Sequence, residues 1–298
     1  MTNSSTATDL SANLTPEEIL ARVRRLQIRA RRLVKRLFIG QYHSVFRGRG
    51  LEFSEVRQYQ PGDEVRMIDW NVTARMGEPY IKKYVEEREL ILYLLVDISA
   101  SADFSSSGAS KRELAAELAT LLAFAAQANN DKSGLIAFSD RVELYLEPAK
   151  SQQHVLRLAR ELLYLRPQGR GTRLSSAIDV LMRIAKRPGV VFLISDFYDQ
   201  GFEASLHLAA QKHDVTAISL TDPRELELPR VGLINLRDPE TGRERDRYAR
   251  GAADWVVSRR RLLASLGVEE VAIRTDRSYI QPLMAYFKSR ASHRRAAV

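Results

Sequence analysis

Oxygen-bearing side chains follow two apolar runs of the chain. Asp97 ends the run "LILYLLVD", and Ser99 and Ser101 follow it at intervals of two residues. Asp196 comes directly after a second run, "VVFLIS", and Thr172 lies in the loop "GRGT". Two carboxylates and three hydroxyls are hard oxygen donors, which suit Mg²⁺, Mn²⁺ or Ca²⁺ and not zinc. These residue types therefore predict a divalent-cation site, with Mg²⁺ as the first choice.

The charge of this donor set indicates the kind of site. Two carboxylates balance a divalent ion, and three neutral hydroxyls add no negative charge, so the ion can still attract one more anionic oxygen. A carboxylate of a partner protein could supply that oxygen. The pattern therefore favours a metal-bridged contact between proteins over a hydrolytic centre.

The elements that must position these side chains follow from hydrophobic patterning. Short apolar runs alternate with amphipathic segments, which is typical of an α/β fold: a doubly wound, mostly parallel, Rossmann-like sheet with helices on both faces. In such a sheet, ligands gather at the carboxyl ends of the strands, where Asp97 and Asp196 are expected as neighbours. The expected strands are 91–96, 133–138, 142–146, 190–195, 215–220 and 271–274, with a peripheral hairpin near 233–242. The expected helices are 111–128, 152–165, 174–186, 202–213, 252–266 and 278–289.

The amino-terminal part is predicted to contain a basic amphipathic helix. Thr15, Pro16 and Glu18 form a helix start with a capping hydroxyl, proline in the first turn and a glutamate three residues after the cap. Apolar residues follow at intervals of three and four, with arginines on the other faces. The stripe either docks on the domain or serves an acidic partner or an anionic lipid surface. We expect three regions: an arm at 1–47, a charged strand segment packed on the core at 48–89, and the main domain at 90–298.

Composition limits the function classes. The chain has 298 residues, no cysteine and a net charge of +9. Residues 1–50 and 243–298 each carry +7, while the middle carries −5. The basic flanks leave open an alternative function in binding nucleic acid or an anionic surface. No apolar run is long enough for a membrane span and no secretory signal is visible, so a cytoplasmic protein is expected.

Enzyme motifs are missing. A phosphatase with an aspartate nucleophile needs a second acidic residue two positions later, where this chain has Ser99. The phosphate-binding G-x-x-x-x-G-K-[ST] loop and the serine-nucleophile G-x-S-x-G motif are both absent. We therefore expect a protein that is not an enzyme, and a magnesium-dependent hydrolase is a less favoured alternative.

The pattern Asp97-x-Ser99-x-Ser101, with Thr172 and Asp196 in later loops, resembles the metal-ion-dependent adhesion site (MIDAS) of von Willebrand factor type A domains. The resemblance covers about residues 90–220. It implies that all five residues are metal ligands.

A second resemblance lies upstream, in Gly50 to Glu89. This text contains Glu-Phe, Arg-x-Tyr, Pro-Gly-Asp, Arg-x-Ile-Asp-Trp and Ala-Arg, and it is similar to the bacterial family called domain of unknown function fifty-eight. That family is associated with MoxR-type AAA+ ATPases. The resemblance implies a partner or adaptor of such an ATPase, acting on an acidic client in protein assembly or maturation.

The charged segment has two interpretations. Its side chains could form a partner-binding surface, or they could form an internal network of ion pairs and hydrogen bonds, which partly buried charges require. The second interpretation is favoured. The residues concerned are Arg57, Asp63, Arg66, Asp69, Trp70 and Arg75.

Overall fold

The computed structural model describes most of the domain predicted at 90–298 and parts of the chain before it. The described residues are 15–35, 42, 55–63, 65, 68–83, 90–103, 105–106, 109–169, 171–226, 235–237, 244–246 and 252–296.

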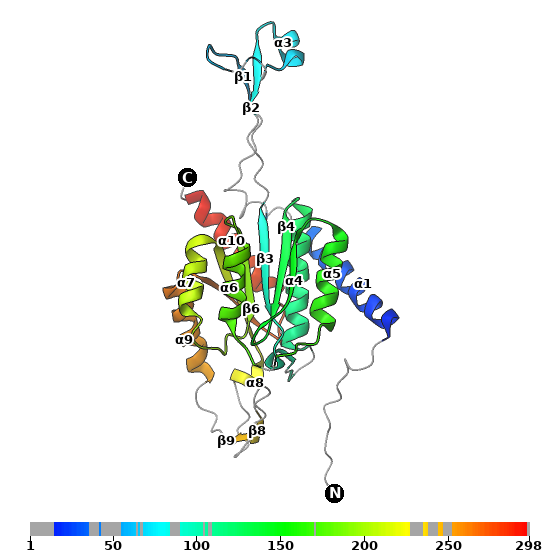
Figure 1. The fold of residues 1–298 in the computed structure, drawn as a ribbon, viewed down its shortest axis with the longest axis vertical. Coiled ribbons are helices and arrows are strands. Elements are labelled where there is room, and N and C mark those ends of the chain that lie inside the picture. Colours follow the sequence, from blue (N-terminus) through cyan, green and yellow to red (C-terminus); the bar gives the residue numbers. More distant parts are fainter. Residues whose placement is uncertain are drawn as a thin grey trace.

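A six-stranded sheet forms the centre of the molecule (Figure 1), in the order β10-β7-β6-β3-β4-β5. Five strands are parallel, and β5 pairs antiparallel with β4 at one edge. The chain leaves the central strand β3 toward β4 and later returns to β6 on its other side, so the strand order reverses between β3 and β6. Ligands bind at such a switch point in open α/β sheets. The strands are β3 (Ile91–Asp97), β4 (Lys132–Phe138), β5 (Val142–Ala149), β6 (Val190–Ser195), β7 (Asp214–Thr221) and β10 (Glu269–Arg274).

Helices cover both faces of the sheet, which confirms the predicted fold class. Alternate residues of β3 point to opposite faces: Leu92 and Leu94 belong to one apolar cluster, and Tyr93 and Leu95 to the other. The first face is covered by α4 (Lys111–Ala128), α5 (Gln152–Tyr164) and α10 (Ile280–Ala296). The second is covered by α6 (Leu174–Ile184), α7 (Glu203–Lys212) and α9 (Ala252–Ser265).

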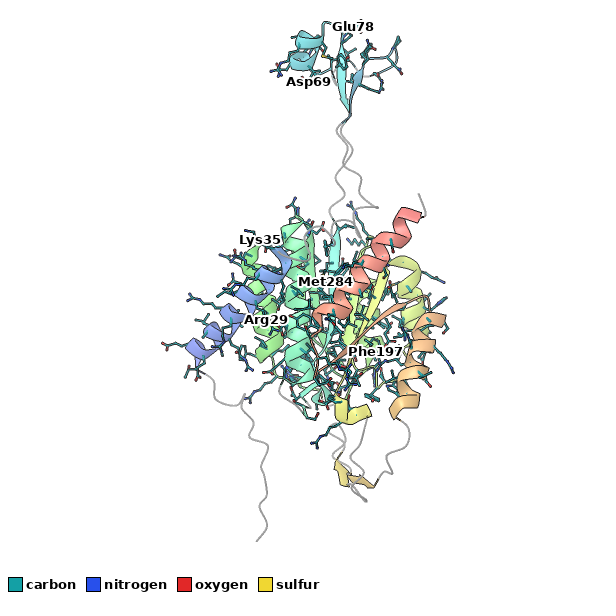
Figure 2. The ribbon with its side chains drawn as sticks, turned by 180° about the vertical axis from the view of Figure 1, so that it is seen from behind. Arg29, Lys35, Asp69, Glu78, Phe197 and Met284 are labelled. Carbon is teal, nitrogen blue, oxygen red and sulfur yellow. The ribbon has the colours of Figure 1, made fainter. Side chains whose placement is uncertain are left out.

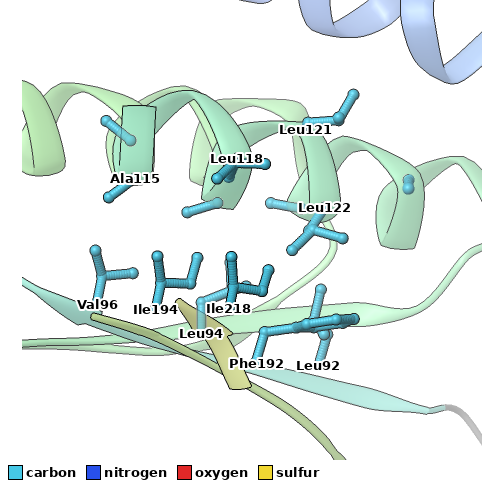
Figure 3. Packing of buried hydrophobic residues seen from close by; sticks show 14 of the residues in the cluster. Leu92, Leu94, Val96, Ala115, Leu118, Leu121, Leu122, Phe192, Ile194 and Ile218 are labelled. Carbon is cyan, nitrogen blue, oxygen red and sulfur yellow. The ribbon is translucent and has the colours of Figure 1, made fainter. Parts of the chain in front are cut away.

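The helix α4 is buried along most of its length because it lies between the sheet and other helices. Leu118 and Leu122 face Val96, Ile194 and Phe192 of the sheet (Figure 3), and Leu118 is completely buried. Ser110 caps the helix in a capping box with Glu113, so its first turn is fixed at the carboxyl edge of the sheet. This edge holds the predicted site.

The basic helix α1 (Pro16–Leu33) begins with the expected capping box between Thr15 and Glu18. Its apolar stripe is packed on the domain, where Val23 and Ala30 are buried. Arg29 pairs with Glu117 of α4, with 2.8 Å between Nη1 and Oε1. Figure 2, turned by 180° from Figure 1, shows α1 with Arg29 and α10 with Met284. The docking interpretation is therefore correct for the described part of this helix. Leu37, which continues the apolar stripe in the sequence, lies outside the described residues.

The charged segment forms a small unit of its own. The antiparallel strands β1 (Glu55–Gln58) and β2 (Tyr80–Lys83) are joined through α3 (Trp70–Met76). Figure 1 draws this unit apart from the six-stranded sheet, beyond the amino end of β3. The described residues 55–63, 65 and 68–83 do not show the expected packing of segment 48–89 on the core, which stays a prediction. The sequence reading also missed α3.

The remaining elements are peripheral. Helix α8 (Pro223–Leu226) follows β7, and β8 (Asn235–Arg237) pairs antiparallel with β9 (Glu244–Asp246) in the region of the expected hairpin. The predicted turn at 238–242 lies outside the described residues. In the described part of the chain, no helix is long and apolar enough to cross a membrane.

Candidate metal and partner-binding site

The carboxylate of Asp97 is held at the carboxyl end of β3. It is 3% exposed, its Oδ1 accepts a hydrogen bond from the backbone N–H of Ser99 at 2.9 Å, and its Oδ2 accepts one from Ser195 Oγ at 2.7 Å. Ser195 is the last residue of β6, so this bond links the ends of the two strands at the switch point. Both donors are neutral, and the carboxylate charge is therefore not cancelled by them.

The two serine hydroxyls of the D-x-S-x-S pattern lie together. Ser99 Oγ and Ser101 Oγ are 3.0 Å apart, and the short 3₁₀-helix η4 (Ala100–Asp103) carries the second of them. Ser99 is fully buried. Because the Ser99 backbone also holds Asp97, the pattern brings one carboxylate and two hydroxyls to one place, as the sequence predicted.

Asp196, directly after β6, is paired with a lysine that the sequence analysis did not single out. Its Oδ2 lies 2.7 Å from Lys111 Nζ, and both side chains are 2% exposed. The same ammonium group lies 2.6 Å from Oε1 of Glu225 in α8. Asp196 Oδ1 accepts a hydrogen bond from the backbone N–H of Tyr198 at 3.2 Å. The second predicted carboxylate thus already has a cationic partner within the chain.

The electrostatics of the site follow from this arrangement. Burial, and next the charge of Asp196, raise the pKa of Asp97 to about 7. For Lys111, burial acts against the charged form but the two carboxylates outweigh it, and its pKa is raised. Burial also raises the pKa of Glu225, although Lys111 opposes the shift. The ionised form of Asp97 is therefore disfavoured by its surroundings, because no cationic group contacts this carboxylate directly, and a cation bound beside it would stabilise that form.

The loop of Thr172 comes to the same edge of the sheet. The backbone N–H of Arg173 donates to Ser139 O at 2.9 Å, and Ser139 follows β4, the neighbour of β3. Gly169 permits this approach: a Cβ atom there would lie 2.3 Å from Ser139 Oγ. The structure places the Thr172 backbone near the other predicted ligands, and its participation as a ligand stays a prediction.

Aromatic side chains border the cluster formed by Lys111, Asp196 and Glu225. Tyr198 stacks on Trp255 of α9 with ring centroids 5.3 Å apart, and Lys111 Nζ lies 6.0 Å from the centre of the Tyr198 ring. Burial raises the pKa of Tyr198 to about 12, so the phenol is neutral at physiological pH. At 45% exposure, Tyr198 offers an aromatic surface at the rim of the site.

Sequence reasoning missed three contributors to the site: Lys111, Ser195 and Glu225. Ser195 could have been found, because it directly precedes Asp196 at the end of an apolar strand. Lys111 gave a weaker signal, a lysine in the first turn of a helix where an acidic residue is usual. Glu225 gave none, since only the fold brings it near Lys111.

Some charges of the charged segment are satisfied within it, while the favoured interpretation, a network that also pins the segment onto the core, stays a prediction. Arg57 Nη2 lies 2.7 Å from Asp63 Oδ1, and Asp69 caps α3 by accepting the N–H groups of Asn71 and Val72. Trp70 is 67% exposed and Arg75 is exposed. Arg66 lies outside the described residues. The capping role explains Asp69. Trp70 is the largest of three exposed apolar side chains in the described part of this unit; the other two are Val65 and Met76.

The donor set fits a hard cation in part. Asp97, Ser99 and Ser101 supply oxygen donors from one loop, and an uncompensated buried carboxylate favours binding of a cation. Asp196 meets the requirement less well, because Lys111 holds one of its oxygens. No group of three or more histidine, aspartate or glutamate side chains that could hold a metal occurs within the described ranges. A site here therefore depends on the hydroxyl donors.

Comparisons with known proteins agree on a family. The model of the family described as "Protein of unknown function DUF58" matches residues 55–251, and the chain belongs to this family. The chain is 32% identical over 293 residues to "Uncharacterized protein Rv1480" of Mycobacterium tuberculosis, covering 94% of this chain and 92% of that protein. It is 37% identical over 134 residues to "Uncharacterized protein MAV169" of Mycobacterium avium, covering 42% and 79%. The first likeness covers more of the chain than the residues that the family model matches.

Solved structures with similar folds are more distant. BatB from Bacteroides thetaiotaomicron is 18% identical with a TM-score of 0.48, covering 68% of this chain and 99% of that one. The VWA domain of SpRpn10 is 13% identical with a TM-score of 0.38, covering 64% and 92%. These values are too low to transfer any property, and the class of the fold rests on the sheet and helices described above.

Proposed function

We propose that this chain is a non-enzymatic, metal-dependent protein-interaction module, in which a divalent cation at the carboxyl ends of β3 and β6 binds an acidic residue of a partner protein. The carrying observation is the cluster of the buried Asp97 carboxylate with the Ser99 and Ser101 hydroxyls, which lie 3.0 Å apart. These groups would hold the ion, with Thr172 and Asp196 as further predicted ligands. Mg²⁺ is the first choice, and Mn²⁺ or Ca²⁺ would also suit oxygen donors.

The charge of the cluster supports this proposal. Asp97, Asp196 and Glu225 carry three negative charges when ionised, and Lys111 carries one positive charge. The remaining charge of −2 matches one divalent ion. A bound ion would attract a carboxylate oxygen of the partner, which is the chemistry that the cation supplies here.

The resemblance of this chain to a family associated with MoxR-type AAA+ ATPases suggests the biological context. In this proposal the chain is an adaptor of such an ATPase and presents an acidic client for assembly or maturation. The exposed Trp70 is a candidate contact for the ATPase, on a unit that Figure 1 places at the amino end of β3. The cation site lies at the opposite end of that strand, so the two contacts would not compete.

Metal binding is tested by titration calorimetry of the full chain with MnCl₂ or MgCl₂. The Asp97→Asn variant keeps the shape and one of the two hydrogen-bond acceptors but removes the charge, and binding should weaken at least tenfold. Asp179→Asn, on the exposed face of α6, is the matched control and should bind as wild type does. Equal binding by Asp97→Asn and wild type would contradict the site.

The partner is tested by a pull-down with the MoxR-type ATPase encoded nearest to the gene. Capture should fall on adding chelator and in the Ser99→Ala variant, and Trp70→Ala should reduce it independently of metal. Capture that is indifferent to chelator, Ser99→Ala and Trp70→Ala alike would reject the adaptor role.

A further inference from the structure

The position of Lys111 is not explained by the helix that carries it. Lys111 is the first residue after the cap Ser110 of α4, at the end of the helix where backbone N–H groups create a positive potential. A cation is unfavourable there, and burying an ammonium group without partners is strongly unfavourable. Two carboxylate contacts offset both effects, so the reason for this lysine lies in the carboxylates around it.

Lys111 is shared between two carboxylates from different elements. Its Nζ lies 2.7 Å from Asp196 Oδ2 and 2.6 Å from Glu225 Oε1. Glu225 is fixed independently, because its Oε2 accepts the backbone N–H of Asp222 at 2.9 Å. If Asp196 turned away, Lys111 would therefore retain a partner that does not depend on the predicted cation site.

Asp196 is in a different situation from Asp97. The donors that hold Asp97 are neutral, whereas Asp196 shares one oxygen with an ammonium group. A divalent ion approaching Asp196 has to compete with Lys111 for that oxygen, whereas at Asp97 it meets no such competitor. The two predicted carboxylate ligands are thus unequal.

We infer that Lys111 is a positioning residue that competes with the divalent cation for Asp196 and thereby weakens cation binding. Asp196 binds the ion only after it releases Lys111, which then stays with Glu225. This inference rests on the proposed metal site and adds a regulator to it. The cation is held first by Asp97, Ser99 and Ser101, and the chain's own ammonium group limits the contribution of Asp196.

The test is a double-mutant cycle read by Mn²⁺ calorimetry on the full chain, with wild type, Lys111→Met, Asp196→Asn and the double variant. Removing the ammonium group should tighten Mn²⁺ binding by about tenfold or more, since Asp196 Oδ2 is then no longer held by Lys111 and can bind the ion. In the Asp196→Asn background the same removal should have little effect, because Lys111 acts through Asp196.

Folding needs its own control, since Lys111→Met leaves two buried carboxylates without their cation. Lys111→Gln retains a hydrogen-bond donor and should show the same direction of change. The Mn²⁺-induced rise in melting temperature, measured on each variant, gives a second readout and should be larger for both Lys111 variants than for wild type. Lys212→Met is the control: it removes a lysine of α7 whose Nζ donates to the backbone oxygen of Ala185, and it should leave Mn²⁺ binding unchanged.

The outcomes separate this inference from the metal site itself. Wild-type binding of Mn²⁺ with no gain in either Lys111 variant overturns the competition and leaves the metal site intact. A gain that persists fully in the Asp196→Asn background also overturns it, because the lysine would then act through its general field. Absence of Mn²⁺ binding in wild type and in both Lys111 variants contradicts the proposed function.

Discussion

Ser195 Oγ lies 2.7 Å from Asp97 Oδ2 and joins the carboxyl ends of β6 and β3. The same hydroxyl oxygen accepts a hydrogen bond from the backbone N–H of Phe197 at 3.0 Å. Phe197 is buried and has a φ of 62°, a left-handed conformation that non-glycine residues adopt at a cost. One serine therefore fixes both the carboxylate of the site and the turn that carries Asp196.

The first prediction concerns this serine. In Ser195→Ala, the carboxylate of Asp97 and the N–H of Phe197 each lose a buried partner, and we expect a loss of about 2–3 kcal/mol of unfolding free energy. Urea denaturation followed by circular dichroism measures it. Ser292→Ala, which removes an exposed hydroxyl on α10 bonded to Ser289 O, should change stability by less than about 0.5 kcal/mol. Similar small effects in both variants would mean that the buried hydroxyl does not hold the site.

The packing of α4 on the sheet gives a second prediction. Leu118 is fully buried opposite the β-strands, so Leu118→Ala should lower the unfolding free energy by about 2–5 kcal/mol through lost contacts and the cavity left behind. Leu208→Ala makes the same chemical change on α7 at a side chain that is 56% exposed, and it should cost little. Chemical denaturation of the two variants in parallel provides the comparison. Equal losses would show that α4 does not pack as Figure 3 depicts.

The central strands β3 and β6 were predictable because short stretches of the sequence are enough to indicate them. The apolar runs that became β3 and β6 are buried on both faces, and such short, uniformly apolar runs are typical of strands in a covered parallel sheet. Knowing that carboxyl ends of these strands converge was enough to place Asp97 and Asp196 together. Ser99 and Ser101 lie with Asp97 because the Ser99 backbone N–H donates to that carboxylate and the two serine hydroxyls are 3.0 Å apart.

The pairing of Asp196 with Lys111 was not predictable, since 85 positions separate the two residues. Spacing along the chain does not reveal which carboxylate a lysine will reach, and Glu225 joins them from a helix of four residues. The helix α3 was missed for another reason. Asp69 and Gly77 are ordinary cap residues for a helix. A helix of seven residues is short, however, and this one lies in a charged segment between two strand-like stretches, so it was not predicted.

The docking of α1 leads to a third prediction. Ala30 is 2% exposed against the domain, so Ala30→Asp would bury an unpaired carboxylate and should destabilise the protein by about 3 kcal/mol. Ala21→Asp places the same residue on the exposed side of this helix and should have little effect. Thermal unfolding of the full chain distinguishes them. If α1 did not pack on the domain and instead served to bind an acidic partner, Ala30→Asp and Ala21→Asp would have the same melting temperature.

The fourth prediction is a loss of stability at acidic pH through His213. This side chain is 3% exposed, and its Nδ1 accepts the backbone N–H of Gly189 at 3.2 Å. Burial, and next the charge of Lys212, lower the pKa of His213 to about 4, against 6.5 for an unperturbed histidine. The unfolded chain therefore binds more protons than the folded one between these values, and stability falls as the pH falls from about 6.5 to 4. The contribution is on the order of 2–3 kcal/mol.

The variant His213→Asn tests this origin of acid sensitivity. Asparagine can accept the Gly189 N–H through its Oδ1 but does not titrate, so the difference in unfolding free energy between pH 7.5 and 4.5 should shrink by about 2 kcal/mol relative to wild type. Urea unfolding at the two pH values provides the four free energies required. His207→Asn, the same change on the exposed side of α7, should retain the wild-type difference. If His213→Asn retained it as well, the acid sensitivity would have to come from other groups, and the buried imidazole would not be held neutral by its surroundings.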